Sequence, residues 1–295
     1  MRFSNPYIAA TVVVLLAVSP LWAWSVTGLG AAGGWDDINK SSSVSAVLDT
    51  SDYTLDMPGA NTNTALLNAF GTLDAVETAP GLNFEYLADT GGNYDVFDLV
   101  GGALDQSADW KYADIVVGGF MPLDYFDGNS GILAVTWTGQ LTNGRGKPRW
   151  VSEVYFNDFW NWTDDGAAAD ADLAAGMPEL LIDLETVALH ELGHAVGLGH
   201  EDTVPAIMGS YYAGTQRELL ADDIAGLEAI YAAKGGGGGG GKGGGRGKPD
   251  RMMVDGVEWM LTGVTFMDAD AMSVPEPATM SLLALGTIAL IRRRR

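Results

Sequence analysis

Apolar residues recur at helical spacing in two parts of the chain. The first part runs from Asn61 to the residue before Pro80, and it predicts an amphipathic helix. Its apolar positions are Ala65, Leu66, Ala69, Phe70, Leu73 and Val76. The second part predicts a long helix that starts near Pro178 and carries apolar residues inward at Leu181, Leu184, Val187, Ala188 and Leu189.

Shorter apolar or alternating segments predict strands between and before these helices. The predicted strands cover residues 44–48, 83–87, 113–120 and 151–158, and a tight loop from Phe126 feeds a further strand that reaches Trp137. The segment 113–120 is apolar and β-branched, which is typical of a buried strand. Strands and helices in this order indicate an α+β fold with a mixed sheet.

The two ends of the chain differ in composition from its centre. Arg2 precedes an apolar run from Ile8 to Val18, and Ala23 and Ser25 provide small residues at the spacing of a cleavage site. This pattern predicts a secretory signal peptide over residues 1–25. A membrane anchor is the alternative, although the apolar run is short for a bilayer span.

The composition changes again at Lys234. Residues 234–250 are nearly all glycine and predict a flexible linker, which leaves residues 26–233 as the main domain. Residues 251–273 contain too few apolar side chains to fold alone. They could form a hairpin, dock on the main domain or act as a short spacer, and the sequence leaves these three alternatives open.

Residues 274–295 combine the segment Val274-Pro275-Glu276-Pro277, an apolar stretch from Ala278 to Ile291 and four terminal arginines. This order resembles the PEP-CTERM sorting signal of Gram-negative bacteria. The resemblance implies an exosortase-type sorting enzyme as a partner, transient anchoring in the inner membrane, and a final location at the cell surface or in the extracellular matrix. A C-terminal tail anchor is the alternative, and both place the main domain outside the cytoplasm.

Charge and cysteine content narrow the classes of function. The chain has 16 Lys and Arg against 38 Asp and Glu, a formal net charge of −22. Binding to a nucleic-acid backbone is disfavoured, whereas cationic substrates or calcium are favoured. Because the chain has no cysteine, neither a disulfide nor a thiolate metal ligand is available.

The three histidines of the chain all lie in one segment, at His190, His194 and His200. On a helix, four residues advance about 6 Å and roughly one turn, so His190 and His194 share a face. Gly197 can adopt a positive φ, end the helix and return the chain so that His200 reaches the same ion. Three imidazoles leave the fourth position of a zinc ion to water, as in catalytic sites. A core helix without a metal is the alternative.

Glu191 directly follows the first histidine, so its carboxylate would lie beside the open coordination position. Zinc lowers the pKa of its bound water to about 7, and a carboxylate there can accept the proton as the water attacks a polarised carbonyl. The segment therefore predicts amide hydrolysis with Glu191 as the general base.

The spacing His-Glu-x-x-His-x-x-Gly-x-x-His resembles the metzincin metalloproteases, in which a methionine turn follows the motif. Met208 falls where that turn is expected, and it would form an apolar floor below the histidines. Residues 219–231 look like the closing helix of the matrixin branch. Asp222 and Asp223 there suit the positive end of the helix and could accept bonds from the methionine turn.

The resemblance to matrixins implies further site residues. Leu133 and Ala134 would lie on an edge strand above the cleft and offer backbone groups to an extended peptide, although an ordinary edge strand is equally compatible with the pattern. Tyr212 would help to wall the specificity pocket. A calcium site is implied at Asp127, the carbonyls of Gly128, Ser130 and Ile132, and Asn157. A simple Asp-Gly turn is the alternative there.

The chain departs from matrixins at the second, structural zinc site. Phe120, Pro122, Val135 and Tyr155 occupy the positions of its ligands, and none of them is a plausible zinc ligand. We therefore expect one zinc ion per chain, with hydrophobic packing in place of the second.

These observations favour an exported zinc endopeptidase that acts on peptide or protein substrates. The first alternative is a matrix-associated binding protein that retains the zinc fold without significant turnover. The second is a hydrolase of non-peptide amides, which no residue excludes. Nucleic acid is not an expected partner, and membrane contact is expected only through the terminal segments.

Overall fold

The computed structural model describes the central domain and a hairpin near the C-terminus. The described residues are 25–27, 29, 34–35, 43–50, 57, 59–77, 79, 82–96, 108–109, 111–126, 128–142, 149–177, 179–231, 251–254 and 257–268. The predicted linker and sorting segment, almost all of the predicted signal peptide, and Asp127 and Pro178 lie outside these ranges.

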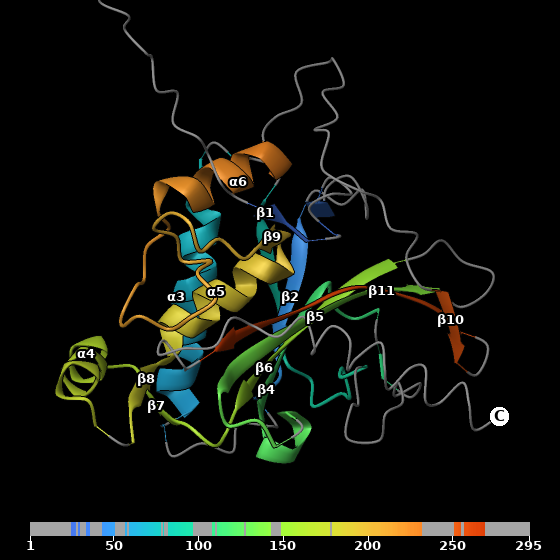
Figure 1. Cartoon of the computed structure of the whole chain (residues 1–295). Helices are drawn as coiled ribbons and strands as arrows, with labels where there is room; N and C mark the ends of the chain where they lie inside the picture. Colours follow the sequence, from blue (N-terminus) through green and yellow to red (C-terminus); the bar gives the residue numbers. More distant parts are fainter. Residues whose placement is uncertain are drawn as a thin grey trace, which may run out of the picture.

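A seven-stranded mixed sheet forms one layer of the molecule, with the strand order β10-β11-β5-β6-β4-β2-β3 (Figure 1). Its strands are β2 Val44–Leu48, β3 Phe84–Leu87, β4 Ile115–Met121, β5 Ile132–Thr142, β6 Arg149–Asn157, β10 Arg251–Val254 and β11 Val257–Asp268. β2 pairs in parallel with both β3 and β4, and β4 pairs in parallel with β6. β5 runs antiparallel to both β6 and β11. The strands predicted from apolar alternation are thereby confirmed.

Three helices pack together beside this sheet: α3 Gly59–Asp74, α5 Leu184–Ala195 and α6 Ala221–Tyr231 (Figure 1). α3 lies against α5, and α5 contacts β5 and β6. Leu66 and Phe70 of α3 are fully buried, and the rings of Phe70 and Phe84 meet edge to face at 5.0 Å. The apolar side of α3 thus packs against the core. The predicted α+β fold is confirmed.

One helix boundary was predicted wrongly. The helix expected from near Pro178 begins at Leu184, because residues Leu181–Asp183 form strand β8, which pairs in parallel with β7 (Asn161–Thr163). Asp183 is the N-cap of α5, and its side chain accepts a hydrogen bond from the Thr186 N–H at 3.0 Å. A capping aspartate in extended backbone ends the strand and starts the helix.

Several short elements were not predicted. A 3₁₀ helix, η2, covers Leu123–Phe126, and helix α4 covers Gly166–Ala175 with Asp165 as its N-cap and Gly176 in the left-handed region after it. Near the N-terminus, β1 (Ser25–Val26) pairs antiparallel with β9 (Leu198–Gly199). The last residue of the predicted signal peptide therefore lies against the segment that follows the zinc-motif helix.

The expectation that Leu133 and Ala134 lie on an edge strand is wrong for the chain as described. β5 is paired on its outer side by β11, and the register joins Ala134 to Met267. Strands β10 and β11 thus form a hairpin that docks on the main sheet, which are two of the three alternatives left open for residues 251–273. None of the described helices combines the length and the hydropathy that a membrane-spanning segment needs.

Candidate metal centre

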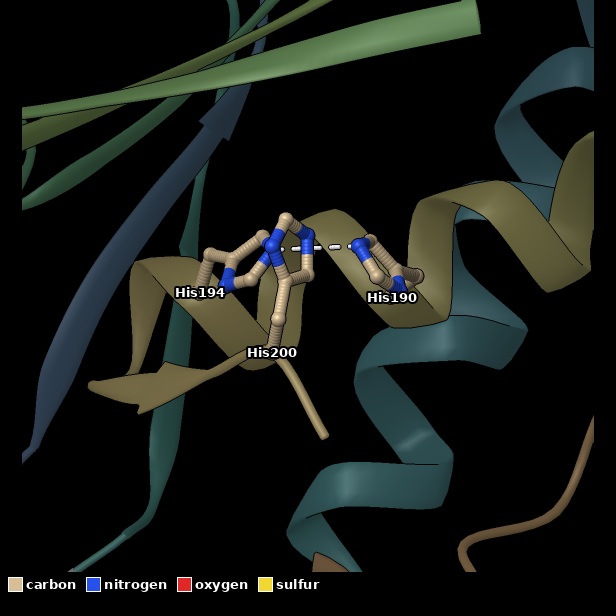
Figure 2. A group of neighbouring side chains, drawn as sticks. All are labelled: His190, His194 and His200. Carbon is tan, nitrogen blue, oxygen red and sulfur yellow. Dashed lines mark hydrogen bonds between the residues drawn. The ribbon is translucent and has the colours of Figure 1, made fainter. Parts of the chain in front are cut away.

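The three histidines converge as their spacing predicts (Figure 2). His190 and His194 project from α5, and His200 follows the turn after the helix. One ring nitrogen from each of the three lies within 4.8 Å of the others. The Nε2 atoms of His190 and His194 are 3.0 Å apart, and two nitrogens bound to one tetrahedral zinc ion at about 2.0–2.1 Å lie about 3.3–3.4 Å apart. The three histidines therefore fit a single zinc ion if the Nε2 atoms of His190 and His194 move slightly apart.

Backbone carbonyls fix the orientation of two of the rings. The Nδ1 atom of His190 lies 2.8 Å from the carbonyl oxygen of Ile207, and that of His194 lies 2.9 Å from that of Leu198. Each Nδ1 therefore carries the hydrogen and donates it, which leaves the Nε2 lone pair for a metal.

Burial also keeps these imidazoles neutral. Desolvation, and after it the nearby His200, lowers the pKa of His190 to about 3. The pKa of His194 is lowered well below its ordinary value, first by burial and then by the two neighbouring histidines. Neutral imidazoles are the form that binds zinc.

Gly197 makes the turn that brings in the third ring. α5 ends at Ala195, and Gly197 has a φ of 110°, which favours glycine. The N–H of Thr27 donates to the Gly197 carbonyl at 2.8 Å, and the Ser25 hydroxyl donates to the His200 carbonyl at 2.7 Å. The positive φ predicted for Gly197 is confirmed, and the N-terminal segment supports the turn.

Met208 lies below the histidine-bearing helix, as predicted. It is 2% exposed, and its sulfur fills the space that a Cβ on Gly193 would occupy. Asp223 holds this turn from α6, because its carboxylate accepts bonds from the N–H groups of Ile207 at 2.9 Å and Met208 at 3.3 Å. It also accepts from the Leu220 N–H at 2.8 Å. The expected bond from Asp223 to the methionine turn is confirmed.

Glu191 is fully buried beside the histidines, and its carboxylate contacts the sheet. The Thr136 hydroxyl of β5 lies 2.5 Å from Glu191 Oε2 and 2.9 Å from the Glu191 carbonyl oxygen. The shorter contact is a hydrogen bond to a carboxylate, the stronger type. Thr136 therefore holds the carboxylate in one orientation. No pattern in the sequence indicates this role, because threonine is an ordinary residue of a buried strand.

Tyr212 is a buried anchor at the start of α5. It is 2% exposed, and its hydroxyl accepts a hydrogen bond from the Asp183 N–H at 3.1 Å. Burial raises its pKa to about 12, so the phenol stays protonated. Asp183 is also bound by the Arg217 guanidinium, at 2.5 Å. Tyr212 thus ties the loop after the methionine turn to the zinc-motif helix, and its contact with a substrate stays a prediction.

Two of the predicted calcium ligands already accept hydrogen bonds within the chain, whereas Asp127 lies outside the described residues. The Ile132 carbonyl accepts hydrogen bonds from the Asn157 side-chain amide at 2.8 Å and from Trp160 Nε1 at 3.2 Å. Asn157 Oδ1 accepts the Phe159 N–H at 3.1 Å. Both oxygens are therefore engaged by N–H donors, and the geometry of Ile132 and Asn157 favours the turn over the ion.

Apolar and aromatic side chains pack at the positions of the matrixin structural zinc. Phe120, Val135 and Tyr155 are each 2% exposed or less, whereas Pro122 is exposed. Phe120 lies 5.2 Å from the Phe156 ring and 6.0 Å from the Trp162 ring, measured between centroids. These contacts support hydrophobic packing in place of a second ion, and the count of one zinc stays a prediction.

Comparison with known proteins agrees with the motif. The family model described as Matrixin matches residues 109–232, and the one described as the PEP-CTERM protein-sorting motif matches residues 273–295. Karilysin of Tannerella forsythia is 33% identical over 106 residues, which cover 36% of this chain and 19% of karilysin. Stromelysin-1 of Rattus norvegicus is 28% identical over 184 residues, which cover 61% of this chain and 30% of that protein.

A plant relative also matches part of the chain. Metalloendoproteinase 1-MMP of Arabidopsis thaliana is 32% identical over 136 residues, which cover 44% of this chain and 33% of that protein. The chain therefore spans about a third or less of the length of these three relatives. Residues 109–232 nevertheless contain the zinc helix, the methionine turn and the closing helix in the matrixin order. The chain carries a matrixin domain with the metzincin zinc-binding motif, followed by a PEP-CTERM sorting motif.

Proposed function

We propose that the protein is an exported zinc metalloendopeptidase that hydrolyses peptide bonds. The observation that supports it best is the convergence of three imidazoles beside one buried glutamate. His190, His194 and His200 would hold the ion. Zinc at this position would act as a Lewis acid that lowers the pKa of a water molecule and polarises a carbonyl.

Glu191 would carry the proton transfers. Its carboxylate accepts a proton from the attacking water and later gives it to the leaving amine, so one side chain serves as base and then as acid. The Thr136 hydroxyl orients Oε2 throughout. Because the carboxylate is fully buried, bulk water does not compete for it.

The test is replacement of Glu191 by alanine in the zinc-loaded chain. Casein cleavage should fall at least about 10²–10⁴-fold, because that is the usual contribution of general acid–base catalysis. Zinc content should stay near one ion per chain. Glu185→Gln, which alters the other acidic residue of α5, serves as the control and should retain activity. Activity retained in Glu191→Ala would contradict the proposal.

The alternative is a matrix-associated binding protein that keeps the zinc fold without significant turnover. The intact Glu191 and its hydrogen bond from Thr136 favour the enzyme. The wild-type chain separates the two hypotheses, because zinc-dependent casein cleavage is expected only of the enzyme. A peptide library beside a set of non-peptide amides tests the remaining substrate class.

The C-terminal motif indicates export and sorting to the surface. We propose an exosortase-type enzyme as the processing partner, in a Gram-negative cell, with the domain released to the cell surface or extracellular matrix. Mutation of Pro275, Glu276 and Pro277 to alanine should leave the precursor unprocessed. Normal processing of that variant, seen as an unchanged mass of the exported protein, would contradict this proposal.

A further inference from the structure

Strand β11 occupies the outer edge of β5 beside the metal centre. The pairing joins Glu258 to Thr142 at one end and Asp268 to Ile132 at the other. Figure 1 shows the two strands running together past α5, and β11 also contacts that helix. The main-chain groups on this edge of β5 are therefore paired within the chain.

The part of β11 next to the site is Gly263 to Met267. Thr265 is directly opposite Thr136, the residue whose hydroxyl binds Glu191. Met267 is opposite Ala134. An extended peptide that added to β5 as a strand would need the same backbone groups, because each strand edge accepts one partner. β11 and such a peptide therefore exclude each other.

Two features mark this part of β11 as a separable segment. The register shifts between Leu261 and Gly263 and again between Met267 and Asp268, so the pairing from 263 to 267 is bounded by irregularities. β10 pairs only with residues 257–260 of β11. Among the described strands, the segment is thus held from one side, as an added peptide would be.

We propose that β11 is an intramolecular occupant of the peptide-binding edge of β5, and that a peptide binds in the cleft only when β11 is displaced. This proposal rests on the proposed function, which makes the space beside β5 a substrate cleft, but peptide binding can be measured without turnover. Nineteen residues, 232–250, join α6 to β10 in the sequence. A tethered strand acts at an effective concentration of about millimolar, so a weakly binding peptide at low concentration is excluded.

The test uses the full-length, zinc-loaded chain with Glu191→Ala, so that nothing is cleaved. One form carries Val135→Cys and Phe266→Cys, at directly opposite positions. Opposite residues of antiparallel strands have Cα atoms about 4.5–5.5 Å apart, which a disulfide can bridge. Since the natural chain has no cysteine, only these two thiols can pair. Oxidation then locks β11 in place, reduction releases it, and the two single-cysteine chains are the controls.

A second form carries Val264→Pro and Thr265→Pro, which removes two successive N–H groups. One of the two faces β5, because N–H directions alternate along a strand. The probe is a fluorescein-labelled peptide that reproduces residues 257–268, and its binding is followed by anisotropy.

We expect no binding to the oxidised form, measurable binding to the reduced form, and binding at least tenfold tighter to the proline form. Equal behaviour of the three forms, whether all bind or none binds, would overturn the inference. With Glu191 restored, casein cleavage should follow the same order. If peptide binding follows this order but no form cleaves casein, the inference that β11 occupies the edge of β5 is supported. The proposed hydrolase function is then contradicted.

Discussion

The hydrogen bond from Thr136 to Glu191 allows a direct test of how the site is built. Thr136→Val removes the hydroxyl and keeps the shape of the side chain in a position that is 1% exposed. A hydrogen bond to a charged group contributes about 1.5–3 kcal/mol. If that orientation is needed at the transition state, kcat should fall roughly 10- to 150-fold.

The assay separates orientation from folding. Steady-state cleavage of a peptide should show a lower kcat with KM within about twofold of the wild type, since the substituted group orients the base and does not bind substrate. Zinc content should not change. Thr136→Ser keeps a hydroxyl and should recover most of kcat.

Thr138→Val is the matched control. This residue lies two positions along β5, and its hydroxyl is 2.7 Å from that of Ser152 rather than near Glu191. It should lose stability without a comparable loss of kcat. A wild-type kcat in Thr136→Val, or an equal loss in Thr138→Val, would refute the role of Thr136.

Four other predictions concern residues elsewhere in the domain. Gly197→Ala places a Cβ at a φ of 110°, which costs about 1–3 kcal/mol, so the variant should lose zinc to a chelator faster than the wild type. Asp223→Asn weakens three backbone hydrogen bonds and should lower the free energy of unfolding by about 1–3 kcal/mol in urea titrations; an unchanged midpoint would count against it. The pKa of His190 is about 3 in the folded chain and about 6.5 when unfolded, so the unfolded state binds more protons between these values. The stability of the zinc-free protein should therefore fall below pH 6.5, by about 1.4 kcal/mol per pH unit for this residue, and His190→Gln should reduce that slope. Because the Ile132 carbonyl already accepts two N–H donors, the melting temperature should be the same in calcium and in EGTA. A melting temperature that is clearly higher in calcium would support the calcium site.

The sequence predicted the convergence of the three histidines because the motif is local. His190, Glu191, His194, Gly197 and His200 lie within eleven residues, and helical geometry places them without knowledge of the rest of the chain. The methionine turn needed the resemblance to a family, since nothing in its own residues shows that Met208 returns to the helix.

Long-range pairing was less predictable. β11 pairs with β5 across more than a hundred residues of sequence, and its apolar content alone did not distinguish a docked hairpin from a spacer. Similarly, Trp35 donates its indole N–H to the Ala195 carbonyl at 3.0 Å, yet no pattern near Trp35 indicates a partner at the end of α5. Helix α4 went unpredicted because its residues are mostly alanine and aspartate, without an apolar stripe.

The coordination of the metal is the central claim, and X-ray absorption spectroscopy of the zinc-loaded, full-length chain measures it directly. We predict one zinc ion per chain, with three imidazole nitrogens at about 2.0–2.1 Å and one exchangeable oxygen ligand. His200→Ala should remove one nitrogen from this shell and weaken binding. A shell with two imidazoles, or one closed by a fourth protein ligand, would contradict the account.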